Sequence, residues 1–214
     1  MDYDLQVRVA AFNWLSEHVN SIGDVLPRKL LEKGFESVDN WYSSEELSGL
    51  RTSLLRRYEK QAFAMAGIGK NQYHQREEKI RNDQILWLNK TDANDFENRF
   101  FEKMDDFVIH LNRTCFAGIR DYEFHYAVFE KGAFFKKHAD RFKNDDRRQF
   151  SFVSYLTENW QKGDGGEIIL YANGQEIKIE PIPGRVIFFS ADLQHEVLPT
   201  NIQRLSLAGW LKTG

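Results

Sequence analysis

The sequence predicts an α+β protein, with helices in its first half and a sandwich or barrel of short strands in its second half. Apolar residues recur at helical spacing as far as Leu111, and after Gly118 their period becomes two. Glycines and prolines separate the apolar runs of the second half, as is typical of turns between strands. Helices that precede such strands are expected to pack on one outer face of the sheet.

Composition restricts the class of protein. The 214 residues are 42% hydrophobic and 14% aromatic, which predicts one globular domain over residues 1–214. A net charge of −3 provides no basic field for nucleic acid, and the single cysteine excludes disulfides and cysteine-based zinc clusters. No apolar run approaches the ~20 residues of a membrane span. We expect a cytoplasmic protein, favour a monomer, and expect no nucleic-acid or membrane partner.

Three helices are predicted in the first half. Apolar residues at helical spacing indicate the first over Leu5–Val19. Ser43 followed by Glu46 has the spacing of a capping box and predicts a second helix that runs into the mid-sixties. Thr91 and Asp92 are candidate caps for a third. Its apolar face would contain Phe96, Phe100, Met104, Phe107, Val108 and Leu111.

Strands are predicted from apolar runs and period-two patterns. The run Ile85–Leu88 indicates a buried strand, preceded by a polar segment over 70–82 that we expect to be a surface loop. Asn173 followed by Gly174 is a strong hairpin signal. The strand candidates of the second half are Glu123–Phe129, Gln149–Leu156, Glu167–Leu170, Glu176–Ile179, Arg185–Phe189 and Leu205–Leu211.

A candidate metal site is formed by His138, Asp140 and His195. Two imidazoles and one carboxylate make a facial triad for Fe(II), which leaves three coordination positions open for a bidentate 2-oxo acid and O2. His138 and Asp140 are two residues apart, a spacing that places side chains on one face of a strand. Because roughly 0.4 His-x-Asp matches are expected by chance, this tripeptide alone is a weak signal, and a surface histidine beside a solvated aspartate is its alternative.

Residues around the candidate triad strengthen the interpretation of His138, Asp140 and His195 as metal ligands. Arg204 lies nine residues after His195, and a buried arginine can pair bidentately with a carboxylate such as the distal one of 2-oxoglutarate. Tyr155 lies on the strand after His138, where its hydroxyl could bind the same carboxylate. The other histidines (His18, His74, His110 and His125) have no partner spacing, so we expect no catalytic role for them.

From Tyr126 to Trp210 the chain resembles the 2-oxoglutarate/Fe(II) dioxygenases of the prolyl 4-hydroxylase superfamily. Within it, the chain is most similar to the hypoxia-inducible-factor prolyl hydroxylases and their bacterial relatives. The matching features are the residues of the candidate site, the Gly165-Gly166 pair and the phrase from His195 to Pro199. Upstream, Arg81-Asn82-Asp83 and Ile85–Leu88 are similar to the segment that borders the substrate cleft. Two departures are Phe129, where many relatives have tyrosine, and Ala208, where some have a hydroxyl side chain.

The resemblance implies a double-stranded β-helix, or jelly roll, over residues 119–214, supported by mainly helical residues 1–118 with a possible lid at 66–90. It also implies iron on His138, Asp140 and His195, with Arg204 and Tyr155 on the cosubstrate carboxylate. The implied cosubstrates are 2-oxoglutarate and O2, with ascorbate as reductant and with succinate and CO2 as products.

The resemblance favours a prolyl residue of a protein as the substrate, with Arg148, Arg81 and Asp83 near the rim of the substrate cleft. Solvated surface charges are the alternative for these three residues. Two other functions remain open: hydroxylation of a free amino acid or small metabolite, and a non-catalytic jelly-roll module that binds a metal or peptide.

Overall fold

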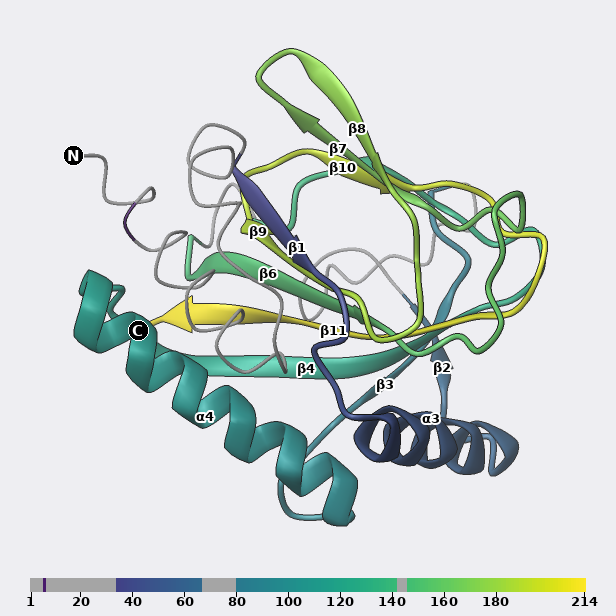
Figure 1. Cartoon of the computed structure of the whole chain (residues 1–214), viewed down its shortest axis with the longest axis horizontal. Helices are drawn as coiled ribbons and strands as arrows, with labels where there is room; N and C mark the ends of the chain where they lie inside the picture. Colours follow the sequence, from purple (N-terminus) through teal and green to yellow (C-terminus); the bar gives the residue numbers. More distant parts are fainter. Residues whose placement is uncertain (1–5, 7–33, 67–79, 142–145) are drawn as a thin grey trace.

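The computed structural model in Figure 1 describes residue 6 and residues 34–66, 80–141 and 146–214. The helix predicted over Leu5–Val19 and most of the predicted lid and surface loop lie outside these ranges. Within the described part of the chain, no helix is long and apolar enough to cross a bilayer.

Two helices and eleven strands are assigned in the described residues. In chain order they are β1 Phe35–Val38, α3 Ser44–Glu59, β2 Ala64–Met65, β3 Gln84–Trp87, α4 Asp95–Cys115, β4 Ile119–Phe129, β5 Phe135–His138, β6 Arg148–Tyr155, β7 Ile168–Ala172, β8 Gln175–Ile179, β9 Val186–Ser190, β10 His195–Val197 and β11 Arg204–Thr213.

The strands form two antiparallel sheets. The large sheet has the order β1-β9-β6-β11-β4-β3-β2, and the small sheet has the order β5-β10-β7-β8. In Figure 1 both helices lie on the outer side of the large sheet, while the β7–β8 hairpin projects at the opposite side. The predicted α+β jelly roll is therefore confirmed, and the two described helices lie on one side of the large sheet. The first half also supplies β1 and β2, which were not predicted, and β3, which corresponds to the strand predicted at Ile85–Leu88.

Both helices begin with a complete capping box. The Ser43 hydroxyl accepts from the N–H of Glu46, whose carboxylate accepts from the N–H of Ser43, as predicted. The helix α3 ends at Glu59 and does not reach the mid-sixties. The helix α4 is capped by Asn94, so the expected caps at Thr91 and Asp92 are wrong.

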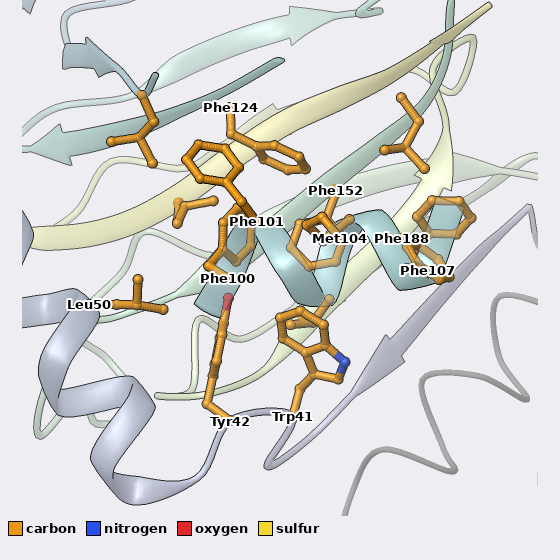
Figure 2. Close-up of a cluster of buried hydrophobic side chains, with 14 of the residues drawn as sticks. Trp41, Tyr42, Leu50, Phe100, Phe101, Met104, Phe107, Phe124, Phe152 and Phe188 are labelled. Atoms are coloured by element: carbon orange, nitrogen blue, oxygen red, sulfur yellow. The ribbon is translucent and has the colours of Figure 1, made fainter. Parts of the chain in front are cut away.

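An aromatic core joins the two helices to the large sheet (Figure 2). Phe100, Met104 and Phe107 of α4 are buried against the sheet residues Phe124 and Phe152. Figure 2 shows these side chains converging in the space between α4 and the strands. The apolar face predicted for the third helix is therefore the face of α4 that packs against the large sheet. This packing holds both helices on the outer face of that sheet.

Most strands of the second half lie where period two predicted them. Asn173 and Gly174 form the turn between β7 and β8 with φ values of 51° and 73°, which confirms the hairpin. The strand β3 is only partly buried, and its Trp87 is 44% exposed, which corrects the expectation of a buried strand. The short strands β1, β2, β5 and β10 were not predicted.

Candidate active site

The structure brings the three predicted metal ligands together. His138 ends β5 and His195 begins β10, and these residues are opposite each other in an antiparallel pair. Asp140 lies beyond the end of β5, so the expectation that it shares a strand face with His138 is wrong. The chain turns there, because the N–H groups of Asp140 and Arg141 both donate to the carbonyl of Ala191 at 3.0 Å. Nitrogen and oxygen atoms of the three side chains lie within 4.8 Å of one another.

Main-chain carbonyls determine how the two imidazoles present their nitrogens. Nδ1 of His138 lies 2.7 Å from the carbonyl oxygen of Lys136, and Nδ1 of His195 lies 3.0 Å from that of Leu193. Because a carbonyl oxygen only accepts, we assign the proton to each Nδ1, which leaves a lone pair on each Nε2. The Nε2 atoms face the Asp140 carboxylate at 3.6 and 3.5 Å. Three potential ligand atoms therefore point into one small space.

The protonation states suit a divalent cation. Burial lowers the pKa of His195 to about 4, although Asp140 opposes this shift. Burial also raises the pKa of Asp140, but His195, His138 and a hydrogen bond from Ser151 outweigh it and hold that pKa well below its usual range. The carboxylate is therefore ionised while the imidazole of His195 is neutral. One anionic oxygen and imidazole nitrogens are a donor set that Fe(II) accepts.

The predicted cosubstrate residues lie together at the start of β11. Arg204 is 2% exposed, and its guanidinium carbon lies 4.8 Å from the ring centres of both Phe129 and Tyr155. One guanidinium nitrogen donates to the Ser206 hydroxyl at 3.2 Å. Nε of Arg204 and the Tyr155 hydroxyl are buried without a hydrogen-bond partner in the described residues. A buried cation with unused donors beside an unused hydroxyl fits a carboxylate ligand, because leaving such groups unpaired is costly.

The Gly165-Gly166 pair lets the backbone approach Arg204 closely. Gly166 has a φ of 74°, and a Cβ at this position would lie 2.8 Å from Cδ of Arg204. At Gly165 a Cβ would lie 2.3 Å from the carbonyl oxygen of Pro199. The left-handed backbone and the lack of space both require glycine here. The turn at Gly165-Gly166 therefore lies directly against the Arg204 side chain and limits the positions that this side chain can take.

A cavity of about 470 Å³ connects the metal ligands with Arg204. Residues from one face of the large sheet line this cavity, most clearly along β4 and β11, where side chains alternate between the two faces. The strand β4 contributes His125, Ala127 and Phe129, and β11 contributes Arg204, Ser206, Ala208 and Trp210. Small side chains occupy the middle of this face, which leaves room beside the metal ligands.

Arg148 lines the cavity and is partly exposed, which is compatible with the predicted place near the rim of the cleft. Its guanidinium carbon lies 3.5 Å from the ring centre of Trp210, and it pairs with the Glu123 carboxylate at 2.7 Å. The guanidinium of Arg148 therefore lies over the indole of Trp210, and the Glu123 carboxylate orients it. This arrangement gives the rim one ordered positive group.

Arg81 and Asp83 also line the cavity, and their side chains form an ion pair with each other. Two hydrogen bonds of 2.8 and 2.6 Å join them, and Asp83 is fully buried. The guanidinium of Arg81 covers the Phe135 ring at 4.2 Å, and that ring stacks on His138 at 3.5 Å. Asp83 is therefore joined to the site through Arg81, and contact of either residue with a substrate stays a prediction.

Three residues of the site were not singled out for it by the sequence. Ser151 donates to the Asp140 carboxylate, Phe135 stacks on a metal-ligand candidate, and His125 lines the cavity. Ser151 had a usable signal, since it lies four residues before Tyr155 on one strand and therefore on the same face. The other two depend on strand pairing that no local pattern reveals.

Comparison with known proteins supports this geometry. The family described as the 2OG-Fe(II) oxygenase superfamily matches residues 124–212. The chain is 32% identical to a prolyl-4-hydroxylase of known structure from Pseudomonas putida, with a TM-score of 0.78, and covers 96% of that chain and 87% of its own length. The chain belongs to the prolyl 4-hydroxylase family of these oxygenases.

Two further proteins are similar to this chain, one in sequence and one in fold. It is 29% identical over 220 residues to a hypoxia-inducible factor prolyl hydroxylase of Caenorhabditis elegans, covering 96% of this chain but only 29% of that relative's length. A prolyl hydroxylase of Trichoplax adhaerens, solved with a peptide fragment of the hypoxia-inducible factor oxygen degradation domain, has the same fold at a TM-score of 0.77. That structure is 21% identical and covers 99% of this chain and 93% of its own. The family uses Fe(II), 2-oxoglutarate and O2.

Proposed function

We propose that this protein is a 2-oxoglutarate- and Fe(II)-dependent dioxygenase that hydroxylates a prolyl residue of a protein. The observation that carries this proposal is the pairing of two features in one cavity. One is the cluster of His138, Asp140 and His195, and the other is the buried, incompletely bonded pair of Arg204 and Tyr155. The first suits a divalent metal and the second suits a carboxylate.

Each group of residues has a distinct task. His138, Asp140 and His195 would hold Fe(II), and Arg204 with Tyr155 would hold the distal carboxylate of 2-oxoglutarate. When bound, the metal and cosubstrate supply the oxidation, in which 2-oxoglutarate and O2 yield succinate, CO2 and a hydroxylated substrate. The chain orients these molecules, and its apolar walls, including Phe129, exclude water from them.

A polypeptide is the substrate that the rim supports best. Arg148 and Trp210 line the same cavity as the metal ligands, and the charged Arg148 is already ordered by its contacts. The Pseudomonas putida relative, which the chain nearly covers, is a prolyl-4-hydroxylase. We propose that Arg148 contacts the substrate directly and that Arg81 and Asp83 support the cleft wall next to His138.

Formation of succinate tests the reaction class. Purified protein with Fe(II), ascorbate and 2-oxoglutarate should form succinate, and peptides that contain proline should accelerate this. The His138→Ala variant should form none. Turnover with free L-proline or another amino acid, but with no peptide, would reassign the protein to metabolite hydroxylation. Metal binding without any decarboxylation would indicate a non-catalytic module.

The proposal extends to the domain organisation, the reductant and the oligomeric state. We propose one dioxygenase domain over residues 1–214, because both described helices pack on the large sheet and the small sheet packs against that same sheet. Ascorbate is proposed as the reductant that keeps the iron in its ferrous form. A monomer that acts in the cytoplasm is the simplest arrangement for an enzyme with this composition.

A further inference from the structure

An aromatic wall closes the end of the cavity that lies away from Arg204. It consists of Trp87 of β3, His125 of β4 and Trp210 of β11, which come from adjacent strands. The His125 ring centre lies 5.0 Å from that of Trp87 and 5.3 Å from that of Trp210. One face of Trp210 is covered by Arg148, whereas Trp87 is 44% exposed. The wall therefore presents Trp87 and the edge of His125 to an incoming molecule.

His125 is the polar member of this wall, and it is incompletely bonded. Its side chain is 4% exposed, and it makes no hydrogen bond to any described residue. Nδ1 is fully covered, whereas Nε2 is not, so Nε2 is the nitrogen that a ligand in the cavity can reach. Burial lowers the pKa of this imidazole to about 4, and it is neutral at physiological pH. Burying a polar group with no partner is unfavourable, which suggests that its partner is a ligand.

The distance along the sheet between Arg204 and His125 indicates which bound molecule reaches His125. Phe129 is opposite Arg204 in the strand pairing, and His125 lies four residues from Phe129 on the same strand. Four residues of strand correspond to roughly 13 Å. A five-carbon diacid held between Arg204 and the metal ligands is too short to reach His125. The group that meets His125 is therefore part of the substrate.

We propose that His125 is a substrate-binding residue that donates a hydrogen bond from Nε2 to a main-chain carbonyl of the polypeptide substrate. This inference rests on the proposed function. A buried N–H without a partner is rarer than a buried acceptor without one, so the covered Nδ1 holds the lone pair and Nε2 holds the proton. A carbonyl oxygen is the acceptor that every polypeptide offers at regular spacing. Trp87 then covers the apolar side of the same segment.

A peptide-retention experiment with two substitutions tests this role. His125→Phe keeps the ring but removes both nitrogens, and His125→Gln keeps an N–H donor near the position of Nε2. Immobilised wild type and variants, loaded with Fe(II) and 2-oxoglutarate without O2, are incubated with a pool of short, terminally blocked peptides centred on proline. Retained peptides are quantified by mass spectrometry. Decarboxylation of 2-oxoglutarate in air without peptide is measured in parallel.

Wild type should retain a subset of the pool, His125→Phe should retain about tenfold less of it, and His125→Gln should stay within about threefold of wild type. The His125→Phe variant should melt at or above the wild-type temperature, because it removes an unpaired polar group. Equal retention by His125→Phe, no retention by wild type, or a lower melting temperature of His125→Phe would overturn the proposal. If wild type retains peptides but does not decarboxylate 2-oxoglutarate, the proposed function fails and the assignment of His125 to peptide binding survives.

Discussion

The hydroxyl of Ser151 donates a hydrogen bond to Oδ2 of Asp140 at 2.6 Å. Ser151 belongs to β6 in the large sheet, whereas His138 and His195 belong to the small sheet. This bond therefore ties the carboxylate that follows β5 to the opposite sheet. One oxygen of Asp140 is oriented, and the other remains directed at His138. Such bonds to a ligating carboxylate tune metal affinity as well as geometry.

Replacing Ser151 should weaken metal binding. We expect Ser151→Ala to lower the affinity for Fe(II), or for Mn(II) as a stable substitute, by about tenfold, because Asp140 loses its orienting donor. Metal titration followed by calorimetry measures this. Ser154→Ala is the matched control, since Ser154 is a buried serine of the same strand whose hydroxyl contacts Tyr42 and the carbonyl of Leu207. It should change metal affinity little, and equal losses in both variants would contradict a specific role for Ser151.

Replacing Arg204 should separate cosubstrate binding from metal binding. We expect Arg204→Met to lower the affinity for 2-oxoglutarate by about 100-fold or more, because a charge-assisted bidentate contact is lost. Metal affinity should be unchanged. Without cosubstrate the variant should be no less stable than wild type, since methionine removes an uncompensated buried charge. Unchanged affinity for 2-oxoglutarate would show that another cation holds the distal carboxylate.

A side chain at position 166 should also weaken the binding of 2-oxoglutarate, because it would crowd Arg204. We expect Gly166→Ala to raise the KM for 2-oxoglutarate, because the new Cβ displaces Cδ of Arg204. Gly174→Ala is a close control, since its φ of 73° matches the 74° of Gly166 but nothing lies within 4 Å of its new Cβ. Both variants should lose about 1 kcal/mol of stability from the left-handed backbone. Only Gly166→Ala should change the KM, as measured by succinate formation.

Acid should destabilise the metal-free protein partly through His125. Its pKa is about 4 in the folded protein and about 6.5 when unfolded, so the unfolded state binds more protons between these values. The free energy of unfolding therefore falls as pH falls through this window, by about 3 kcal/mol in total. His125→Phe should lose less stability than wild type between about pH 7 and about pH 4.5, as measured by urea unfolding. Identical pH profiles would mean that His125 is not buried in its neutral form.

Local signals predicted where helices begin better than where they end. Ser43 and Glu46 form the predicted capping box because its contacts lie within one turn. The helix α3 stops earlier than the glycines after it suggested, since Gln61 adopts a left-handed conformation with a φ of 56° and β2 then pairs with β3. Asn94 caps α4 through contacts that include Ser53 of the other helix. That tertiary bond is not visible in the local pattern.

The site was predictable where its chemistry depends on residue type and not where it depends on strand pairing. His138, His195 and Arg204 stood out because few side chains bind metals or carboxylates in this pattern. The strand pairing that brings His125 beside Trp210 joins residues 85 positions apart, and no spacing along the chain reveals it. The sequence therefore predicts only that His125 has no catalytic role, and the strand pairing is what suggests a role in substrate binding.

The most direct test of the proposed function is mass spectrometry of cell-lysate proteins incubated with the purified enzyme, Fe(II), ascorbate and 2-oxoglutarate. We predict a mass increase of one oxygen atom on a prolyl residue with wild type, and no such product with the His138→Ala variant. No modified protein, with 2-oxoglutarate still consumed when small metabolites are added, would contradict a protein substrate and favour a metabolite hydroxylase.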